Sequence, residues 1–274
     1  MRPLSAGWPR ATPDHALRLI RLFVVTLRLA VALRRRYALN FAGQALAVLA
    51  VFVLLWSGVR IGQDKFAWAG DGTATMIVNF MVFTAAMTAF SRVSIEIVRD
   101  SMQGTLEGFA LSPLGLTSVL LVRTLANMLL DIAFCVVSVC VMMLISGVWL
   151  PLRLHYVIPL LVITVMGVQG FGLMLGGLAL VYKQVSSLFV FCQFALLGLI
   201  IASREQQWLA LYLPLSGGAR VIRSVMIEGS HAGDFSAPMI VGVALNSAAY
   251  LAIGLLVLRR FEEAARNRGI LGHY

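Results

Sequence analysis

The stretch "RDSMQGTLEGFALSPLGL", residues 99–116, interrupts a chain that is otherwise mostly apolar. It brings charged and amide side chains, three glycines and a Ser-Pro step between two long hydrophobic windows. Gly104 is expected to end the helix before it, while Ser112 followed by Pro113 is a favourable start for the next helix. Residues 105–111 then form a short helical turn. The stretch therefore predicts a short polar helix held between two long helices.

The composition around this stretch is that of a membrane protein. The chain has 274 residues, of which 60% are hydrophobic and 12% charged, and its mean hydropathy is +0.90. So few charges could not cover a soluble domain of this size. Windows of about 20 apolar residues can cross a bilayer as helices. The predicted fold is an all-α integral membrane protein with six transmembrane helices, at residues 37–59, 72–91, 132–152, 154–182, 184–203 and 235–258.

The basic residues predict how these spans are oriented. With the N-terminus inside, the cytoplasmic segments hold 16 of the 22 Lys and Arg residues. The positive-inside rule then places both termini in the cytoplasm of a multi-pass protein of the inner (plasma) membrane. The net charge of +10 follows from this topology. Lipid headgroups are its expected counter-ions, and nucleic-acid binding is not expected.

The N-terminal region, residues 1–36, is predicted to be a loose tail followed by a helix from Asp14 that lies in the membrane interface. Four arginines fall within about 100° of arc on this helix, with apolar residues elsewhere; they are Arg18, Arg21, Arg28 and Arg35. A membrane span is the alternative, but its arginines would be costly at mid-bilayer. The six-span domain then covers residues 37–258, and a cytoplasmic tail covers residues 259–274.

The second span is expected to continue past the membrane surface into the loop at about residues 92–113. Ile95, Val98 and Met102 continue an apolar helical stripe, and Arg92, Glu96 and Arg99 are oppositely charged neighbours at helical spacing. The helix is therefore expected to project into the cytoplasm as far as Gly104.

The third helix is expected to begin near Pro113 and to carry Arg123, Asn127 and Asp131 on one face before it becomes wholly apolar. Charged residues near a membrane are costly and are usually paired. This stripe is interpreted as structural, either bridged through Asn127 or paired with a neighbouring helix. A substrate or proton site is the alternative.

Three further features concern packing. In the fourth span, Gly172-x-x-x-Gly176 favours close helix approach. Residues 204–234 predict an outer re-entrant hairpin of two half-helices, broken around Pro214 and Gly217-Gly218 and shielded by protein. The cysteines lie inside predicted spans and are interpreted as small apolar side chains; they are Cys135, Cys140 and Cys192.

The loop residues resemble a known pattern, E-x-x-R-x-x-x-x-G-T-L-E-x-x-x-x-S-P-L. Its matching positions are Glu96, Arg99, Gly104, Thr105, Leu106, Glu107, Ser112, Pro113 and Leu114. This pattern is similar to the cytoplasmic loop of permeases of the ABC type 2 exporter family, which includes multidrug and daunorubicin-resistance permeases and polysaccharide export permeases. The resemblance also takes in the six spans, the start of the fifth span and the "ARVIRSV" run at residues 219–225.

The resemblance implies a permease subunit of an ATP-driven exporter. The short helix would be a coupling helix that docks on a separate ATPase subunit, with Glu107, Arg99 and Asp100 transmitting the force. A second permease chain, identical or closely related, would complete a dimer. ATP and Mg would bind the partner ATPase, because this chain has no G-x-x-x-x-G-K-[ST] run. The chain itself is therefore not expected to be an enzyme or to bind a cofactor or metal.

The family also implies that the second and fifth spans line the substrate path. The candidates are Asn79, Phe83, Thr84, Met87, Phe90, Phe189, Gln193 and Phe194. Their aromatic and methionine character suits an amphipathic or hydrophobic molecule such as a drug, natural product or lipid. A lipid-linked polysaccharide is the alternative cargo, and ordinary packing is the alternative role of each residue.

Other classes of function are weaker interpretations. A membrane enzyme would need acids or histidines converging inside the spans, but Asp131 is the single acid well inside a hydrophobic helix. An ion-coupled carrier would be expected to show inverted repeats and a mid-span acidic pair, and a channel would need a polar ring. None of these is evident in the sequence.

Overall fold

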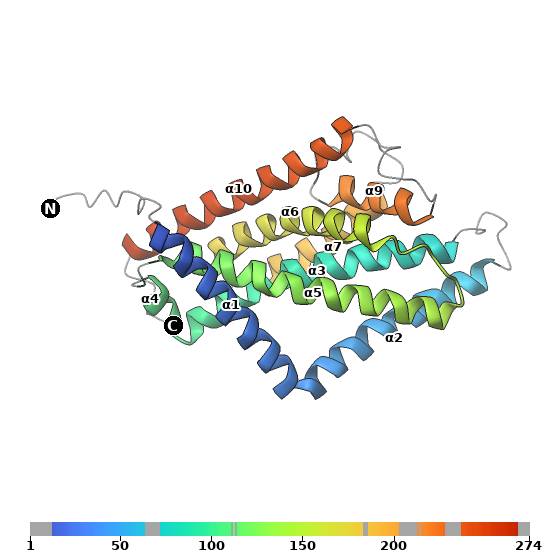
Figure 1. Ribbon diagram of the computed structural model, residues 1–274, viewed down its shortest axis with the longest axis horizontal. Coiled ribbons are helices and arrows are strands. Elements are labelled where there is room, and N and C mark those ends of the chain that lie inside the picture. The colour runs from blue at the N-terminus through green and yellow to red at the C-terminus, as the bar shows by residue number, and fades with distance from the viewer. Residues whose placement is uncertain are drawn as a thin grey trace.

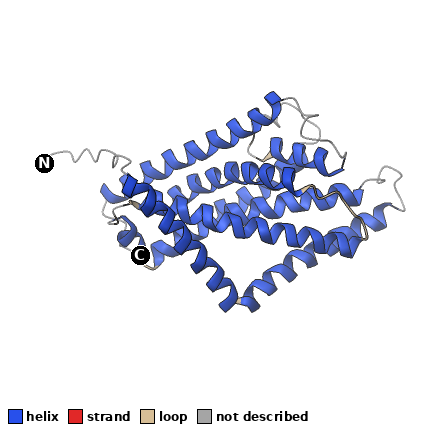
Figure 2. Cartoon of the chain, in the orientation of Figure 1, coloured by secondary structure: helices blue, strands red, loops and turns tan. Residues whose placement is uncertain are grey.

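The computed structural model describes residues 13–63, 72–110, 112, 114–182, 186–202, 213, 215–227 and 237–267. Of the described residues, 92% are helical and none lies in a strand (Figure 2). In chain order the helices are α1 (Pro13–Arg36), α2 (Ala38–Gln63), α3 (Gly72–Met102), α4 (Thr105–Ala110), α5 (Leu116–Ser146), α6 (Leu154–Val181), α7 (Ser186–Ala202), α9 (Ser216–Ile227) and α10 (Ala237–Asn267). The all-α prediction is confirmed for this part of the chain.

Five helices are long and apolar enough to cross a membrane. Their apolar stretches are Ala38–Gly58, Gly72–Ile97, Leu116–Ser146, Leu154–Val181 and Met239–Ala265. The helix expected to be the fifth span, α7, is also apolar, but it has 17 residues, fewer than the 20 or so that a full crossing takes. The chain is therefore a multi-pass helical membrane protein, and the count of six spans stays a prediction.

The third span differs from its prediction at both ends. Helix α5 begins at Leu116 rather than near Pro113, which lies outside the described residues. Its N-cap position is Gly115 (φ 74°, ψ 155°), not Ser112. The helix ends at Ser146, where Gly147 adopts φ 71° and donates its N–H to the Met143 carbonyl at 3.0 Å. The helix carries Arg123, Asn127 and Asp131 as predicted, but the apolar window 132–152 extends beyond its end because Gly147 forms a left-handed cap.

The centre of the molecule is a layer of long helices. Helices α3, α5 and α6 run side by side, with α10 along one edge and α1 and α2 along the other (Figure 1). The main hydrophobic core lies between α2, α3, α5, α6, α7 and α9, and its largest fully buried side chains include Phe52, Phe90 and Met142. Helix α3 contacts most of its neighbours. It is therefore the central helix of the bundle.

Helix α6 packs most closely against α10, at glycines. A side chain on Gly170 would strike the backbone of Tyr250 and Leu251, and one on Gly254 would strike the backbone of Gly170. Gly176 faces Ile97 of α3 instead. The predicted small-xxx-small region is confirmed as a packing surface. The closest approach, however, is made by Gly170 and Gly254 rather than by the Gly172–Gly176 pair.

Helix α1 turns sharply into α2 at Tyr37, so that the two helices form a V whose apex points away from the bundle (Figure 1). Helix α1 packs on α5, and Arg34 in its last turn reaches Asp131. The four predicted stripe arginines are exposed, and so are large apolar residues including Leu17, Ile20, Val25 and Leu29. A long N-terminal helix is thus present, and its amphipathic character stays a prediction. Its position in a membrane interface stays a prediction.

The predicted outer hairpin is described only in part, because residues 203–212, 214 and 228–236 lie outside the described residues. Helix α9 buries the expected Val221, Ile222, Val225 and Met226 against the bundle. Gly217 and Gly218 were predicted to break the hairpin, but they lie in the first turn of α9. Gly218 faces Thr164 of α6 so closely that a side chain could not fit there. Helix α9 begins directly after Leu215, whose φ of 83° is left-handed, and the predicted break at Pro214 lies outside the described residues.

The α6–α10 contact gives a direct test of packing. We expect Gly254→Ala to lower stability by about 1 to 3 kcal/mol, because the new methyl group collides with backbone that cannot rotate away. Gly242→Ala on the same helix, where nothing lies within 4 Å, is the matched control and should be neutral or stabilising by about 0.5 kcal/mol. The measurement is the thermal unfolding midpoint of the detergent-solubilised chain. Equal midpoints for the two variants would contradict the close contact.

Candidate functional site

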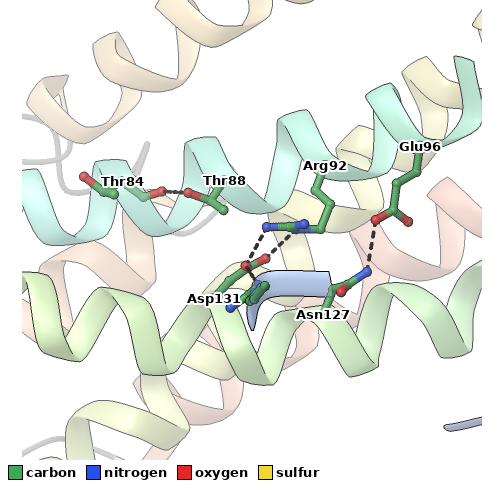
Figure 3. A network of polar contacts seen from close by, with 7 residues as sticks. Thr84, Thr88, Arg92, Glu96, Asn127 and Asp131 are labelled. Atoms are coloured by element: carbon green, nitrogen blue, oxygen red, sulfur yellow. Dashed lines mark hydrogen bonds and ion pairs between the residues drawn. The ribbon is translucent and has the colours of Figure 1, made fainter. Parts of the chain in front are cut away.

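A network of buried charges joins α1, α3 and α5, and Asp131 of α5 lies at its centre (Figure 3). Arg92 of α3 binds both carboxylate oxygens, with Nε donating to Oδ2 and Nη2 to Oδ1, each at 2.8 Å. Arg34 of α1 donates to Oδ1 at 2.6 Å. The Asp131 side chain is only 8% exposed. A bidentate pair of this kind is among the stronger interactions available to a buried carboxylate.

The same network continues along α5. Asn127 donates to Oε1 of Glu96 at 3.0 Å, and Arg123 donates to Oδ2 of Asp100 at 2.7 Å. Arg123 also lies 3.6 Å from the second carboxylate oxygen of Glu96. The polar stripe of α5 is therefore paired with a neighbouring helix, which was one of the two structural interpretations. The direct bridge through Asn127 was wrong.

The spacing along the two helices explains this pairing. Positions 92, 96 and 100 of α3 and positions 131, 127 and 123 of α5 each repeat every four residues, so each set lies on one helix face. Because the helices are antiparallel, each residue of one set lies opposite one residue of the other (Figures 1 and 3). We call these paired residues the charge ladder. With Arg34 included, three cations face three anions. The expected pairing of Arg92 and Glu96 within α3 gives way to partners on α5.

Helix α4 is attached to the α3–α5 charge ladder. The Phe109 ring lies under the Arg123 guanidinium, 5.5 Å from its central carbon to the ring centroid. The Thr105 hydroxyl donates to the Asp100 carbonyl at 3.1 Å, and Gly104 turns the chain between α3 and α4 with φ 66°. Gly104 therefore follows the end of α3 as predicted. The short helix is linked to α3 and α5 at the same point.

A cavity of about 580 Å³ lies beside the charge ladder, between α2 and α3. Its α3 wall includes Arg92 and Glu96, the same side chains that pair with α5. Thr84 and Thr88 line it further along α3, and the Thr88 hydroxyl is turned back to the Thr84 carbonyl at 2.7 Å (Figure 3). The cavity is thus directly next to the buried charges.

The eight residues predicted to line the substrate path do not lie together in the structure. Phe83, Thr84 and Met87 line the cavity. Phe90 is fully buried and packs on Phe171 and on Phe189 of α7.

The remaining path residues lie elsewhere. Asn79 accepts a hydrogen bond from Arg223 of α9 at 2.7 Å, and Gln193 donates to Ser91 at 2.8 Å. Phe194 is 70% exposed on the outside of α7. The structure therefore brings three of the candidates from α3 to one cavity, while those from α7 lie against α3 or face outward.

The predicted coupling residues divide as well. Glu96 and Asp100 belong to the charge ladder, and Arg99 is exposed and lines the cavity. Leu106 and Glu107 lie in α4, but their side chains are outside the described part, as is Pro113 altogether. Ser112 accepts a long hydrogen bond from the Leu114 N–H at 3.4 Å. Within the described stretches, no three His, Cys, Asp or Glu side chains gather as a metal site.

Sequence reasoning missed Arg34 and the interhelical role of Arg92. On a helical wheel Arg34 lies about 100° from Arg35, outside the arc of the four stripe arginines, which is the side that meets α5. The signal was Asp131 itself, since an acid inside an apolar helix requires a cation close by. The two cysteines with the lowest exposure, Cys135 and Cys192, are free and buried, as expected of apolar packing groups.

Comparison of the chain with protein-family models, with curated proteins and with solved structures gave no match. The class is therefore defined by the molecule itself. It is a multi-pass helical membrane protein in which a charge ladder links a short connecting helix to the wall of a lateral cavity.

The charge ladder predicts an ordered set of stabilities. Asp131→Asn leaves Arg34 and Arg92 without a counter-charge, and we expect it to lower stability by roughly 3 kcal/mol. Arg34→Gln should cost less, because Arg92 keeps both of its bonds to Asp131. Thermal unfolding of the two single variants and of the double variant gives the coupling between the residues.

The matched control for Asp131→Asn is Glu263→Gln, which neutralises an exposed acid of α10. Its thermal unfolding midpoint should equal that of the wild-type chain. If Asp131→Asn does so too, the network does not stabilise the bundle.

Proposed function

We propose that the chain is the transmembrane permease subunit of an ATP-driven exporter, and that it moves an amphipathic or hydrophobic molecule out of the cytoplasm or inner leaflet. In this proposal the α4 end of the bundle faces the cytoplasm, both termini lie on that side, and the membrane is the inner (plasma) membrane. ATP and Mg bind separate ATPase subunits docked under α4. A second permease chain completes the assembly.

The observation that carries the proposal is the attachment of α4 to Arg123. A partner that displaces α4 would move the Phe109 ring, and the ring lies against a guanidinium held by Asp100 and Glu96 of α3. A force on one short helix would thus reach α3 and α5 together. Because Arg92 and Glu96 also line the cavity, the same movement would change the shape of the binding space. Coupling needs only a difference in partner affinity between the two arrangements.

The resemblance of residues 96–114 to the loop of type 2 exporter permeases supports the same assignment. The α2–α3 cavity supports an amphipathic cargo, since it has polar groups at one end and aromatic and aliphatic groups at the other. An ion-coupled carrier is weaker, because Asp131, Glu96 and Asp100 are each held by arginine rather than left for a proton or cation. A drug, natural product or lipid is the proposed cargo, with a lipid-linked polysaccharide as the alternative.

The first experiment asks for the energy source. The tagged full chain is purified from its native membrane in a mild detergent, and the proteins that remain bound are identified and quantified. We expect a soluble ATPase at equal stoichiometry and ATP hydrolysis by the complex. Repeated purification of folded chain without any ATPase, together with substrate movement driven by an ion gradient, would overturn the proposal.

The second experiment tests the linkage through α4. In the assembled complex, Phe109→Ala should lower substrate-stimulated ATP hydrolysis by about threefold, the loss expected when one cation–π contact no longer transmits the movement. Phe109→Tyr keeps an aromatic ring under Arg123 and should behave as wild type. Stimulation that is equal in Phe109→Ala and Phe109→Tyr, with assembly intact in both, would remove Phe109 from the coupling route.

A further inference from the structure

The α2–α3 cavity is polar at one end and apolar at the other, and both walls share the gradient. Helix α2 presents Asn40 and Gln44 near its start and then Val48 and Val51. Helix α3 runs antiparallel to α2 (Figure 1). Its lining residues are polar or charged toward the α4 end and aromatic toward the other end; they are Arg99, Glu96, Arg92, Phe83 and Phe80. Because both helices change from polar to apolar in the same direction, the space between them suits an amphiphile.

The length of the gradient fits one leaflet of a bilayer. Asn40 and Val51 are eleven residues apart on α2, which corresponds to about 16 Å along the helix axis. Half of the hydrocarbon core is about 15 Å thick. A molecule whose polar group lies near Asn40 would therefore extend its apolar part along Val48 and Val51 toward the middle of the membrane.

The charges at the polar end favour an anion. Three charged side chains line the cavity, Arg92, Arg99 and Glu96, so that the lining carries one excess positive charge. Glu96 and Arg92 are both paired within the α3–α5 ladder, with Arg123 and Asp131, so the excess positive charge is that of Arg99.

The two arginines still have donors for a ligand. Arg92 turns Nε and Nη2 toward Asp131, and no described residue accepts from its Nη1. Arg99 is exposed, and no ion pair joins it to an acid in the described stretches. An anionic headgroup at this point would meet two guanidinium groups and the amides of Asn40 and Gln44.

The cavity is reached from the side of the molecule. Helix α2 diverges from the layer of α3, α5 and α6 toward its α1 end, the apex of the V (Figure 1). Large apolar side chains on the rest of α2 are exposed, among them Leu46, Leu54 and Leu55 at 67%, 71% and 52%. A surface of this kind faces lipid tails in a membrane protein. The occupant therefore enters from the bilayer.

We propose that this cavity binds an anionic phospholipid from the leaflet at the α4 end of the bundle. Its phosphate lies between Arg99 and the free side of Arg92, and an acyl chain runs along Val48, Val51 and Phe83. The binding site stands on its own, because it requires neither an ATPase partner nor transport.

The test uses the purified full chain in detergent and native mass spectrometry with two probes, phosphatidylglycerol and phosphatidylcholine. Wild type should retain phosphatidylglycerol in preference. Arg99→Gln should weaken that retention about fivefold, the value of one basic residue against an anionic lipid surface. Ala47→Trp, which fills the cavity from its α2 wall, should abolish the preference.

Two matched controls separate the site from general effects. Arg260→Gln removes an exposed arginine from α10, outside the interfacial stripe of α1, and Ala42→Trp adds the same bulk to an exposed position of α2 outside the lining. Both should bind as wild type does.

Equal binding of the two lipids, or loss of preference in a control as large as in its partner variant, would overturn the proposal. Recovery from wild type of an anionic amphiphile other than a phospholipid, lost in Ala47→Trp, would overturn the phospholipid as the occupant.

Discussion

The rest of the structure depends on how one carboxylate is neutralised away from water. Asp131 receives an arginine from α1 and another from α3 while it belongs to α5, so three helices are fastened at one point. A charge buried without partners costs several kcal/mol, which means that none of the three helices can leave without a penalty. The V of α1 and α2 follows from this, because Arg34 also lies over the Phe41 ring just after the turn. The cavity exists because the V holds α2 away from α3.

The two sides of the bundle are held by different physics. On the α10 side, glycines allow backbone to touch backbone, and dispersion forces fix α6 against α10. On the α2 side few contacts hold the helix to α3, and polar groups replace close packing. One side is therefore rigid and the other adjustable. This combination suits the proposed function, in which one wall would give way to admit a molecule from the membrane while the remaining helices keep their arrangement.

Much of the fold could be predicted from the sequence, because apolar windows and glycine stops depend on local chemistry. The helices at α2, α3, α6 and α10 and the left-handed turn at Gly104 belong to this group. The apolar window missed the end of α5 at Gly147, and the partners of Asp131 could not be predicted because they lie 39 and 97 positions away along the chain. Only one half of the candidate site could be predicted from the sequence. Arg123, Asn127 and Asp131 were identified as a stripe, but their partners depend on which helix lies opposite.

The four-residue repeat of the charge ladder has a mechanical consequence. If α3 slid by one repeat, about 6 Å, toward the α4 end, Glu96 would stand opposite Arg123 and Arg92 opposite Asn127, while Asp131 kept Arg34. The reverse slide would set Glu96 against Asp131, two like charges with little water to separate them. Either slide leaves a buried acid worse placed, because the first also takes Asp100 away from Arg123, so electrostatics holds α3 and α5 in the register observed.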